Sequence, residues 1–152
     1  MEIKRVTTID DADTCDRFLT ELIKYESNLD KVINDKFFVQ DFYRRALDSE
    51  NKYLALAFEN NQPLGFIYAY RKIEKGTSFL DNIIEIDGLF IKEDSRSNGI
   101  GSALINAVEN WAKKNYSTAH IEITYINANT PAERCYKKLD YTPIKTILRK
   151  KI

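Results

Sequence analysis

A polar turn with two glycines is the part of the sequence whose residues best suit the binding of an anion. Ser97 or Asn98 can cap the helix that follows, and Gly99 and Gly101 leave several amide N–H groups of its first turn uncovered. Arg96 adds a full positive charge at the lip of the turn. With the positive end of the helix dipole, these groups predict a phosphate or pyrophosphate site, although an ordinary helix start fits the same residues.

Two other phosphate-binding loops do not fit this turn. A dinucleotide-binding fingerprint needs a third glycine where Leu104 stands, and a P-loop needs a Gly-Lys-Ser or Gly-Lys-Thr sequence that the chain lacks. The single histidine, His120, also argues against a histidine-rich metal centre and against a Ser-His-Asp triad. We therefore expect no metal in this protein.

The elements that must position the turn alternate between strands and helices. Strands are predicted at residues 2–7, 53–58, 63–71, 79–91, 119–126 and 143–148, with a hairpin turn at 59–62, a polar connection at 74–78 and a β-bulge near Gly88. Helices are predicted to begin at Asp10 or Asp11, to cover residues 35–47, to follow Gly99, and to run from the capping box at 130–133 to about Asp140. This order predicts one mixed α/β domain over residues 1–152, with a crossover helix joining two parallel strands.

The composition is typical of a globular domain and gives no sign of a nucleic-acid or membrane partner. The 152 residues include 23 basic and 23 acidic side chains, and 43% of the residues are hydrophobic. No apolar run approaches the ~18 residues of a membrane helix, and the N-terminus does not look like a signal peptide. Cys15 and Cys135 are far apart and fit two reduced thiols. We therefore expect a cytoplasmic protein.

Three motifs, in this order, resemble the GCN5-related N-acetyltransferase (GNAT) family. The sequence Arg96-Ser97-Asn98-Gly99-Ile100-Gly101 resembles the family's Gln/Arg-x-x-Gly-x-Gly/Ala loop, and a strand at 87–91 precedes it. Asn129, Ala132 and Tyr136 have the spacing of the family's Asn-x-x-Ala-x-x-x-Tyr segment. Residues 137–141 stand where the family commonly has Leu-Gly-Phe, with Asp140 in place of the glycine. The resemblance, which covers residues 83–143, implies a GNAT-like α/β fold: about six to seven strands in a mixed sheet, about four helices, and splayed parallel strands that form an acetyl-CoA slot.

Acetyl-CoA is the cofactor that this resemblance implies. Its pyrophosphate is expected on the amides of the turn, and its pantetheine arm beside the strand that ends at Ile91. The implied cofactor-binding residues are Leu89, Phe90, Ile91, Arg96, Ser97, Asn98, Gly99, Ile100, Gly101, Ser102, Asn129 and Tyr136.

Transfer of the acetyl group to a primary amine by direct attack is the implied reaction. Tyr136 is the expected general acid for the departing thiolate. Asp87 or Glu85, two residues apart on one strand face, is the expected base, acting directly or through water.

The resemblance also indicates where the acceptor amine binds. Tyr25, Glu26, Tyr68 and Tyr70 are candidate substrate-binding residues, because the first helix and the hairpin flank the acceptor side in the family. The amine belongs either to a small molecule or to a peptide. The alternative function is a catalytically silent acyl-CoA-binding sensor or interaction module of the same fold. An exposed last strand can pair two subunits, so the sequence is compatible with a homodimer.

Overall fold

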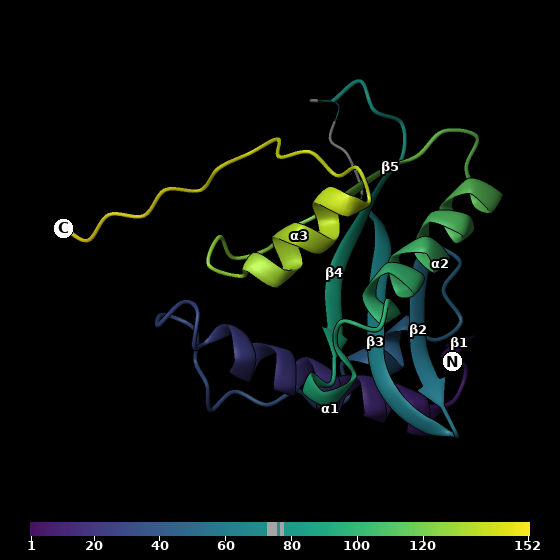
Figure 1. Cartoon of the computed structure of the whole chain (residues 1–152). Coiled ribbons are helices and arrows are strands. Elements are labelled where there is room, and N and C mark those ends of the chain that lie inside the picture. Colours follow the sequence, from purple (N-terminus) through teal and green to yellow (C-terminus); the bar gives the residue numbers. More distant parts are fainter. Residues whose placement is uncertain (73–75, 77) are drawn as a thin grey trace.

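The computed structural model describes residues 1–72, 76 and 78–152, which form one five-stranded sheet with helices on both faces (Figure 1). The strands, in their order across the sheet, are β1 (Glu2–Arg5), β2 (Lys52–Glu59), β3 (Gln62–Lys72), β4 (Ile83–Ile91) and β5 (His120–Ile123). The helices are α1 (Ile9–Glu26), α2 (Ile100–Asn115) and α3 (Thr130–Lys138), with short 3-10 helices η1 (Tyr43–Ala46) and η2 (Glu93–Ser95). Neighbouring strands are antiparallel except for β4 and β5, which are parallel. The predicted mixed α/β class and the crossover helix between parallel strands are therefore confirmed.

The hairpin of β2 and β3 is also confirmed. Glu59 lies opposite Gln62, and the two residues between them, Asn60 and Asn61, take φ values of 49° and 60°. Asparagine tolerates this left-handed backbone, which a two-residue hairpin turn requires. The polar connection predicted at 74–78 lies mostly outside the described residues.

A β-bulge interrupts the pairing of β3 with β4. Tyr68 lies opposite Gly88 and Ala69 lies opposite Ile86, so Asp87 is the extra residue on β4. The bulge predicted near Gly88 is confirmed. Because a bulge shifts the side-chain alternation by one residue, the two halves of β4 present different residues to each face of the sheet.

Both faces of the sheet are covered, which explains the continuous apolar run of β2. On one face, α2 packs Leu104, Ile105 and Val108 against the strands. On the other face, α1 packs Cys15 and Phe18 in a cluster that also contains aromatic residues of η1 and β3. Strands that are buried on both faces carry few polar side chains, and residues 53–57 of β2 are all buried.

The helix predicted at residues 35–47 is wrong. Only η1 forms there, and Phe38, an apolar residue of the predicted helix, has 67% of its surface exposed. The carboxylate of Asp16, which is buried on α1, accepts the amide N–H groups of Phe42 and Tyr43 at 3.2 and 3.0 Å. This segment therefore obtains its backbone partners from a side chain of α1 instead of from its own carbonyl groups.

The strand predicted at residues 143–148 is also wrong. Residues 143–152 are extended and exposed, and they pair with no strand among the described residues. Arg149 instead donates two hydrogen bonds to the carboxylate of Asp30, each 3.0 Å long. The other predicted strands form, although β4 begins at Ile83 rather than at residue 79 and β5 covers only four of the residues 119–126.

The residues that cap the helices differ from those predicted. Thr8, not Asp10 or Asp11, caps α1, and its Oγ1 accepts the N–H of Asp11 at 3.2 Å. Asn129 caps α3 one residue before the predicted capping box. Asp140, which follows α3, has a φ of 62°, the left-handed value expected of a residue standing where the family has glycine.

Candidate functional site

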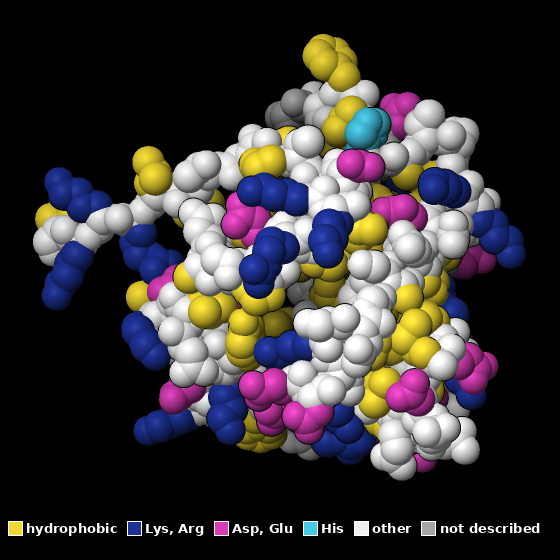
Figure 2. Space-filling model, in the orientation of Figure 1, with side chains coloured by type: hydrophobic (Ala, Val, Ile, Leu, Met, Phe, Trp, Pro, Cys, Tyr) yellow, Lys and Arg dark blue, Asp and Glu magenta, His cyan; other side chains and the backbone are white. Residues whose placement is uncertain are grey.

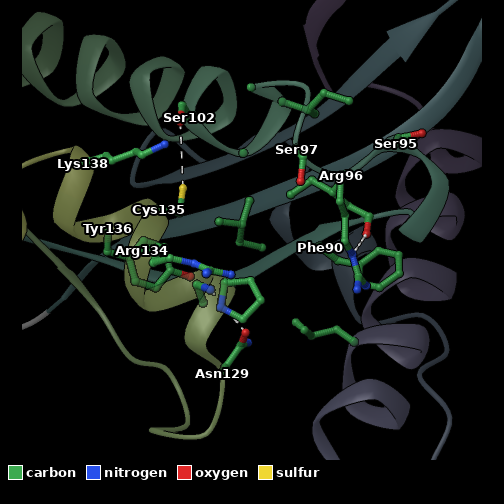
Figure 3. Close-up of a pocket in the computed structure, with 18 of the residues that line it drawn as sticks. Phe90, Ser95, Arg96, Ser97, Ser102, Asn129, Arg134, Cys135, Tyr136 and Lys138 are labelled. Carbon is green, nitrogen blue, oxygen red and sulfur yellow. Dashed lines mark hydrogen bonds between the residues drawn. The ribbon is translucent and has the colours of Figure 1, made fainter.

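A cavity of about 460 Å³ lies between the start of α2, the last residues of β4 and one face of α3 (Figure 3). Its lining includes most of the residues that the sequence predicted for cofactor binding. These are Leu89, Phe90, Ile91, Arg96, Ser97, Gly99, Ile100, Gly101, Ser102, Asn129 and Tyr136. Asn98 was also predicted but is not among the lining residues. The stretches at residues 96–102 and 129–138, which lie about 30 residues apart in the sequence, thus line the same cavity.

The start of α2 presents its first-turn amides to this cavity. Gly99 is the N-cap residue, with a φ of 77°, and the first intrahelical hydrogen bond runs from the Ala103 N–H to the Gly99 carbonyl. The amides of Ile100, Gly101 and Ser102 therefore precede the hydrogen-bonded part of the helix. A Cβ atom added to Gly99 would meet no atom within 4 Å, and Gly101 leaves a second position of this first turn without a side chain. This geometry suits an anion.

Neither Ser97 nor Asn98 caps α2, which corrects the sequence prediction. The side-chain amide of Asn98 instead donates to the Ser95 carbonyl at 3.4 Å. Ser97 takes a left-handed backbone with a φ of 66°. The tight turn needed to enter the helix through Gly99 directs both side chains away from the capping position.

Arg96 does not extend freely at the lip of the turn, as the sequence suggested. Its Nε donates to the Ile91 carbonyl at 3.0 Å, and its guanidinium lies over the ring of Tyr25, 4.7 Å from the ring centre. It also lies 5.8 Å from the ring centre of Phe90. Arg96 therefore ties the turn to β4 and α1 while adding positive charge to one wall of the cavity.

Two basic residues of α3 line the cavity and were not found from the sequence. Arg134 and Lys138 are four residues apart and lie on the same face of the helix, and Figure 3 shows the Lys138 amine extending toward Ser102 on α2. With Arg96 they make three cations, and the described residues that line the cavity include no Asp or Glu. A helical spacing after the Asn129 cap relates Pro131, Arg134 and Lys138. This spacing could have identified the two basic residues from the sequence.

The last three residues of β4, which follow the bulge, line the cavity. Leu89 and Ile91 pack with the α2 face, whereas Phe90 packs with the α1 face. The pairing of β4 with β5 ends at Ile86 and Ile123, so β4 continues for five residues beyond its last β5 partner. The two parallel strands therefore part beside the cavity, as the expected slot requires.

Tyr136 lines the cavity with only 8% of its surface exposed. Its ring packs edge-on against Tyr125, with ring centres 5.6 Å apart, and lies 6.3 Å from Tyr141. Burial raises the pKa of the Tyr136 phenol, and the neighbouring Cys135 and Glu26 raise it further. The phenol is therefore protonated, and able to donate a hydrogen bond, throughout the neutral pH range.

The two candidate base residues lie outside the cavity lining. Glu85 is paired with Lys72 at 3.3 Å, and Lys72 also contacts Glu122 at 3.5 Å. Asp87 is exposed on the bulge, yet incomplete hydration and the nearby charge of Glu85 raise the pKa of its carboxyl group. Both residues lie on β4 before Leu89, which is the first residue of this strand that lines the cavity.

The predicted substrate-binding residues divide into two groups. Tyr25 lines the cavity, and the adjacent Glu26, at the end of α1, has a pKa that burial raises. Tyr68 and Tyr70 lie on β3, with their ring centres 5.8 Å apart. Burial and the charge of Asp87 raise the pKa of Tyr68 to about 12. The first pair therefore borders the slot, and the second lies beside Asp87.

Asn129 lines the cavity but has a structural task as well. Its side-chain oxygen accepts the Ala132 N–H at 3.3 Å and so begins α3. Cys135, on the next turn of α3, places its sulfur 3.9 Å from the Ser102 hydroxyl oxygen on α2. The contact between Ser102 and Cys135 joins the two helices that border the cavity.

No helix in the described part of the chain has the length and hydrophobicity needed to cross a membrane.

Solved structures with the same fold cover essentially the whole chain. A mutant of the BH1408 protein from Bacillus halodurans has a TM-score of 0.86 and 18% identity, over 100% of this chain and 99% of that one. The aminoglycoside antibiotic 6′-N-acetyltransferase from Acinetobacter haemolyticus has a TM-score of 0.68 and 18% identity, over 100% and 99%. The ribosomal-protein-alanine N-acetyltransferase from Brucella melitensis has a TM-score of 0.67 and 16% identity, over 100% of both chains. A search of curated proteins finds no significant match.

A family model decides the assignment. The model of the acetyltransferase (GNAT) family matches residues 17–141, which include the second half of α1, the hairpin, the bulged strand, the glycine turn and α3. Enzymes of this family use acetyl-CoA as the acetyl donor. The chain therefore belongs to the acetyltransferase (GNAT) family and is an N-acetyltransferase.

Proposed function

We propose that residues 1–152 form one N-acetyltransferase domain that transfers the acetyl group of acetyl-CoA to a primary amine by direct attack. One observation carries this proposal: the first-turn amides of α2, the cations of α3 and the Tyr136 phenol all border a single cavity. Acetyl-CoA supplies a thioester and a diphosphate, and the cavity offers a complementary group for each.

The cofactor's diphosphate fits the α2 end of the cavity. The amides of Ile100, Gly101 and Ser102 provide directional donors, and Arg134 and Lys138 provide charge from the opposite wall. The pantetheine arm fits the part of the slot where Leu89 and Ile91 line β4 beyond its pairing with β5. Polar donors at one end and apolar side chains along the other match the two chemical halves of coenzyme A.

Tyr136 acts as the general acid in this proposal. Its phenol stays protonated because burial raises its pKa, and it lies in the same cavity as the diphosphate-binding amides. The phenol donates a hydrogen bond to the sulfur as the carbon–sulfur bond breaks, and the thiolate then leaves as a thiol. Because the raised pKa makes a free phenolate costly, the proton passes to the sulfur within this hydrogen bond as the thiolate forms, and the phenol then regains a proton from solvent.

Asp87 is the preferred base, with Glu85 as the second candidate. A primary amine of pKa ~10.4 must lose a proton before attack, which costs about 4.6 kcal/mol at pH 7. The pKa of Asp87 is raised by limited hydration and by Glu85, which makes its carboxylate a better proton acceptor than an ordinary aspartate. Glu85 is held by Lys72, so it contributes to the local negative charge more readily than to proton transfer. Either group acts directly or through a water molecule.

The acceptor side favours a cationic amine. Asp87 lies beside the rings of Tyr68 and Tyr70, and Glu26 and Tyr25 approach from the end of α1. Carboxylates and aromatic rings both attract an ammonium group before it is deprotonated. The names of two structural relatives point to amine-bearing acceptors, an aminoglycoside in one and a ribosomal-protein alanine in the other. For this chain we propose only what the two acceptors have in common, which is a primary amine, carried by a small molecule or a peptide.

The experiment has two stages. Calorimetry with coenzyme A should show binding, and Gly101→Val should abolish it, because the valine side chain would fill the space that the cofactor needs beside Ile91 and Cys135. Thiol release from acetyl-CoA is then measured with a panel of polyamines, amino sugars, amino acids and peptides. No binding of coenzyme A would overturn the cofactor assignment. Binding without thiol release across the panel would support the alternative, a catalytically silent acyl-CoA sensor or interaction module.

A further inference from the structure

Tyr43 is a buried tyrosine that has no role in the proposed acetyl transfer. It lies in η1, and only 1% of its surface is exposed. Its ring makes edge contacts with Phe66 and Tyr68 of β3, with ring centres 5.5 and 5.0 Å apart, and with Phe42 at 4.9 Å. The ring is therefore held by aromatic neighbours in the cluster that α1 covers.

The hydroxyl of Tyr43 lies against the bulge of β4. A Cβ atom added to Gly88 would stand 2.9 Å from this hydroxyl oxygen, so the hydroxyl fills the space that a side chain at position 88 would take. Gly88 follows Asp87, the extra residue of the bulge. Burial raises the pKa of the Tyr43 phenol, and the nearby Cys15 and Asp87 raise it further. The hydroxyl therefore stays protonated and lies close to the preferred base.

This hydroxyl has no hydrogen-bond partner among the residues that the structure describes. Within the same residues, no side-chain nitrogen or oxygen is both fully enclosed and unpaired, so the hydroxyl reaches the surface although its ring does not. A phenol oxygen carries lone pairs that accept hydrogen bonds as well as one O–H that donates. A polar atom that is presented in this way from a buried ring is available to a ligand.

A buried carboxylate holds this hydroxyl in place. Asp16 on α1 has only 4% of its surface exposed, and its two carboxylate oxygens accept the Phe42 and Tyr43 N–H groups at 3.2 and 3.0 Å. The chain just before η1 is much less buried, since Phe38 exposes 67% of its surface. The position of the Tyr43 hydroxyl is thus fixed before a substrate arrives, which lowers the entropy cost of binding to it.

The charges near Tyr43 differ in sign from those of the cofactor cavity. Figure 2 shows Lys and Arg side chains gathered over α3, which forms one wall of that cavity. Beside the Tyr43 hydroxyl, the nearby charge is the carboxylate of Asp87, and Glu85 lies close to Asp87. The rings of Phe42 and Tyr68 also attract a cation. This corner of the protein therefore suits an ammonium group.

We propose that the Tyr43 hydroxyl binds the acceptor, accepting a hydrogen bond from the ammonium nitrogen that Asp87 deprotonates. This inference rests on the proposed acetyl transfer and adds to it a second protein contact for the nitrogen. An alkylammonium group has three N–H donors. One proton passes to the Asp87 carboxylate, directly or through water, and leaves the lone pair that attacks the thioester carbon. A second N–H stays on the Tyr43 oxygen, so the contact is present both before and during attack.

Tyr43→Phe tests this contact, because it removes the hydroxyl and keeps the ring. The acceptor probe is the amine of the panel that gives the fastest thiol release with the natural chain. The KM for this amine should rise about tenfold while kcat stays within about threefold, since a hydrogen bond to a charged group is lost equally from the bound substrate and the transition state. The dissociation constant of coenzyme A should not change. The melting temperature should not fall, because the hydroxyl has no protein partner to lose.

Tyr53→Phe is the matched control. Tyr53 is also a buried tyrosine, but it lies on β2 and packs on the α2 face of the sheet. Removing its hydroxyl should leave the KM for the amine unchanged. Thiol release with the same amine KM in Tyr43→Phe as in the natural chain would overturn this inference alone. A lower melting temperature of Tyr43→Phe would also overturn it, by showing that the hydroxyl has a structural partner. Absence of thiol release from the natural chain across the panel would overturn the proposed acetyl transfer, and this contact with it.

Discussion

The two sides of the proposed active site are built in different ways. On the cofactor side, the amides of α2 and the cations of α3 come from two short stretches, residues 96–102 and 129–138, each held by hydrogen bonds to near neighbours in the sequence. On the acceptor side, Tyr68 and Asp87 come from the neighbouring strands β3 and β4, and Tyr25 reaches the cavity from α1. Local motifs therefore shape each half of the cofactor side, whereas the acceptor side has no local motif of its own.

This contrast has a functional consequence. The cofactor side can keep the same geometry while the acceptor side changes, because the two sides share few residues. Glu26 and Tyr136 are the link between them, since the charge of Glu26 contributes to the raised pKa of Tyr136. Substitutions on the acceptor side should therefore alter turnover with the amine, and those on the cofactor side should alter affinity for coenzyme A.

The largest effect is expected on the acceptor side. The double variant Glu85→Gln/Asp87→Asn should lower kcat by roughly 10³-fold at neutral pH, because neither proposed base can then take the amine proton. In the natural enzyme, kcat should fall as the pH drops through the raised pKa of Asp87, since the protonated acid is no longer a base. That acidic limb therefore lies above the range of an ordinary aspartate.

The pH dependence of kcat, measured at saturating amine, checks this assignment, and each single variant shows which carboxylate is used. Affinity for coenzyme A should not change in either variant. A double variant that keeps the acidic limb would exclude both residues as the base.

A smaller effect is expected at Tyr136, where the two sides meet. Tyr136→Phe should lower kcat by about 100-fold, since the phenol no longer donates a hydrogen bond to the departing sulfur and water replaces it poorly in a buried site. The dissociation constant of coenzyme A should stay within about twofold, because the ring remains in place.

Tyr141→Phe is the matched control for Tyr136→Phe. Tyr141 also belongs to the tyrosine cluster, but its hydroxyl donates to Glu109 and it does not line the cavity. Steady-state kinetics and calorimetry on both variants separate catalysis from packing. Equal losses of kcat in the two variants would argue for a structural role of the cluster.

The smallest effect is expected on the cofactor side. Lys138→Gln should weaken coenzyme A binding by about tenfold and reduce the salt dependence of that binding, because one cation facing the phosphates is lost. Turnover at saturating acetyl-CoA should stay close to that of the natural enzyme.

Lys137→Gln provides the comparison at the neighbouring position. It removes the same charge from the same helix, but Lys137 points away from the cavity and pairs with Glu133 at 2.7 Å. Calorimetry at two salt concentrations distinguishes the variants. If both weaken binding equally, the effect is one of net charge and Lys138 does not contact the cofactor.

The sequence by itself determined the parts of this protein that depend on neighbouring residues. The Asn60-Asn61 hairpin, the glycine entry to α2, the start of α3 and the left-handed Asp140 follow from backbone preferences over a few residues. These local features also carried the family resemblance, which the match over residues 17–141 confirmed.

Only the tertiary structure decided which partner each remaining group found. Asp16 took the amides of Phe42 and Tyr43 and prevented a helix, and the Ile91 carbonyl and the Tyr25 ring held Arg96 away from the lip of the turn. The basic face of α3 became part of the site only because α3 packs opposite α2. In each case several partners compete for one polar or charged group, and the folded arrangement of distant segments selects among them.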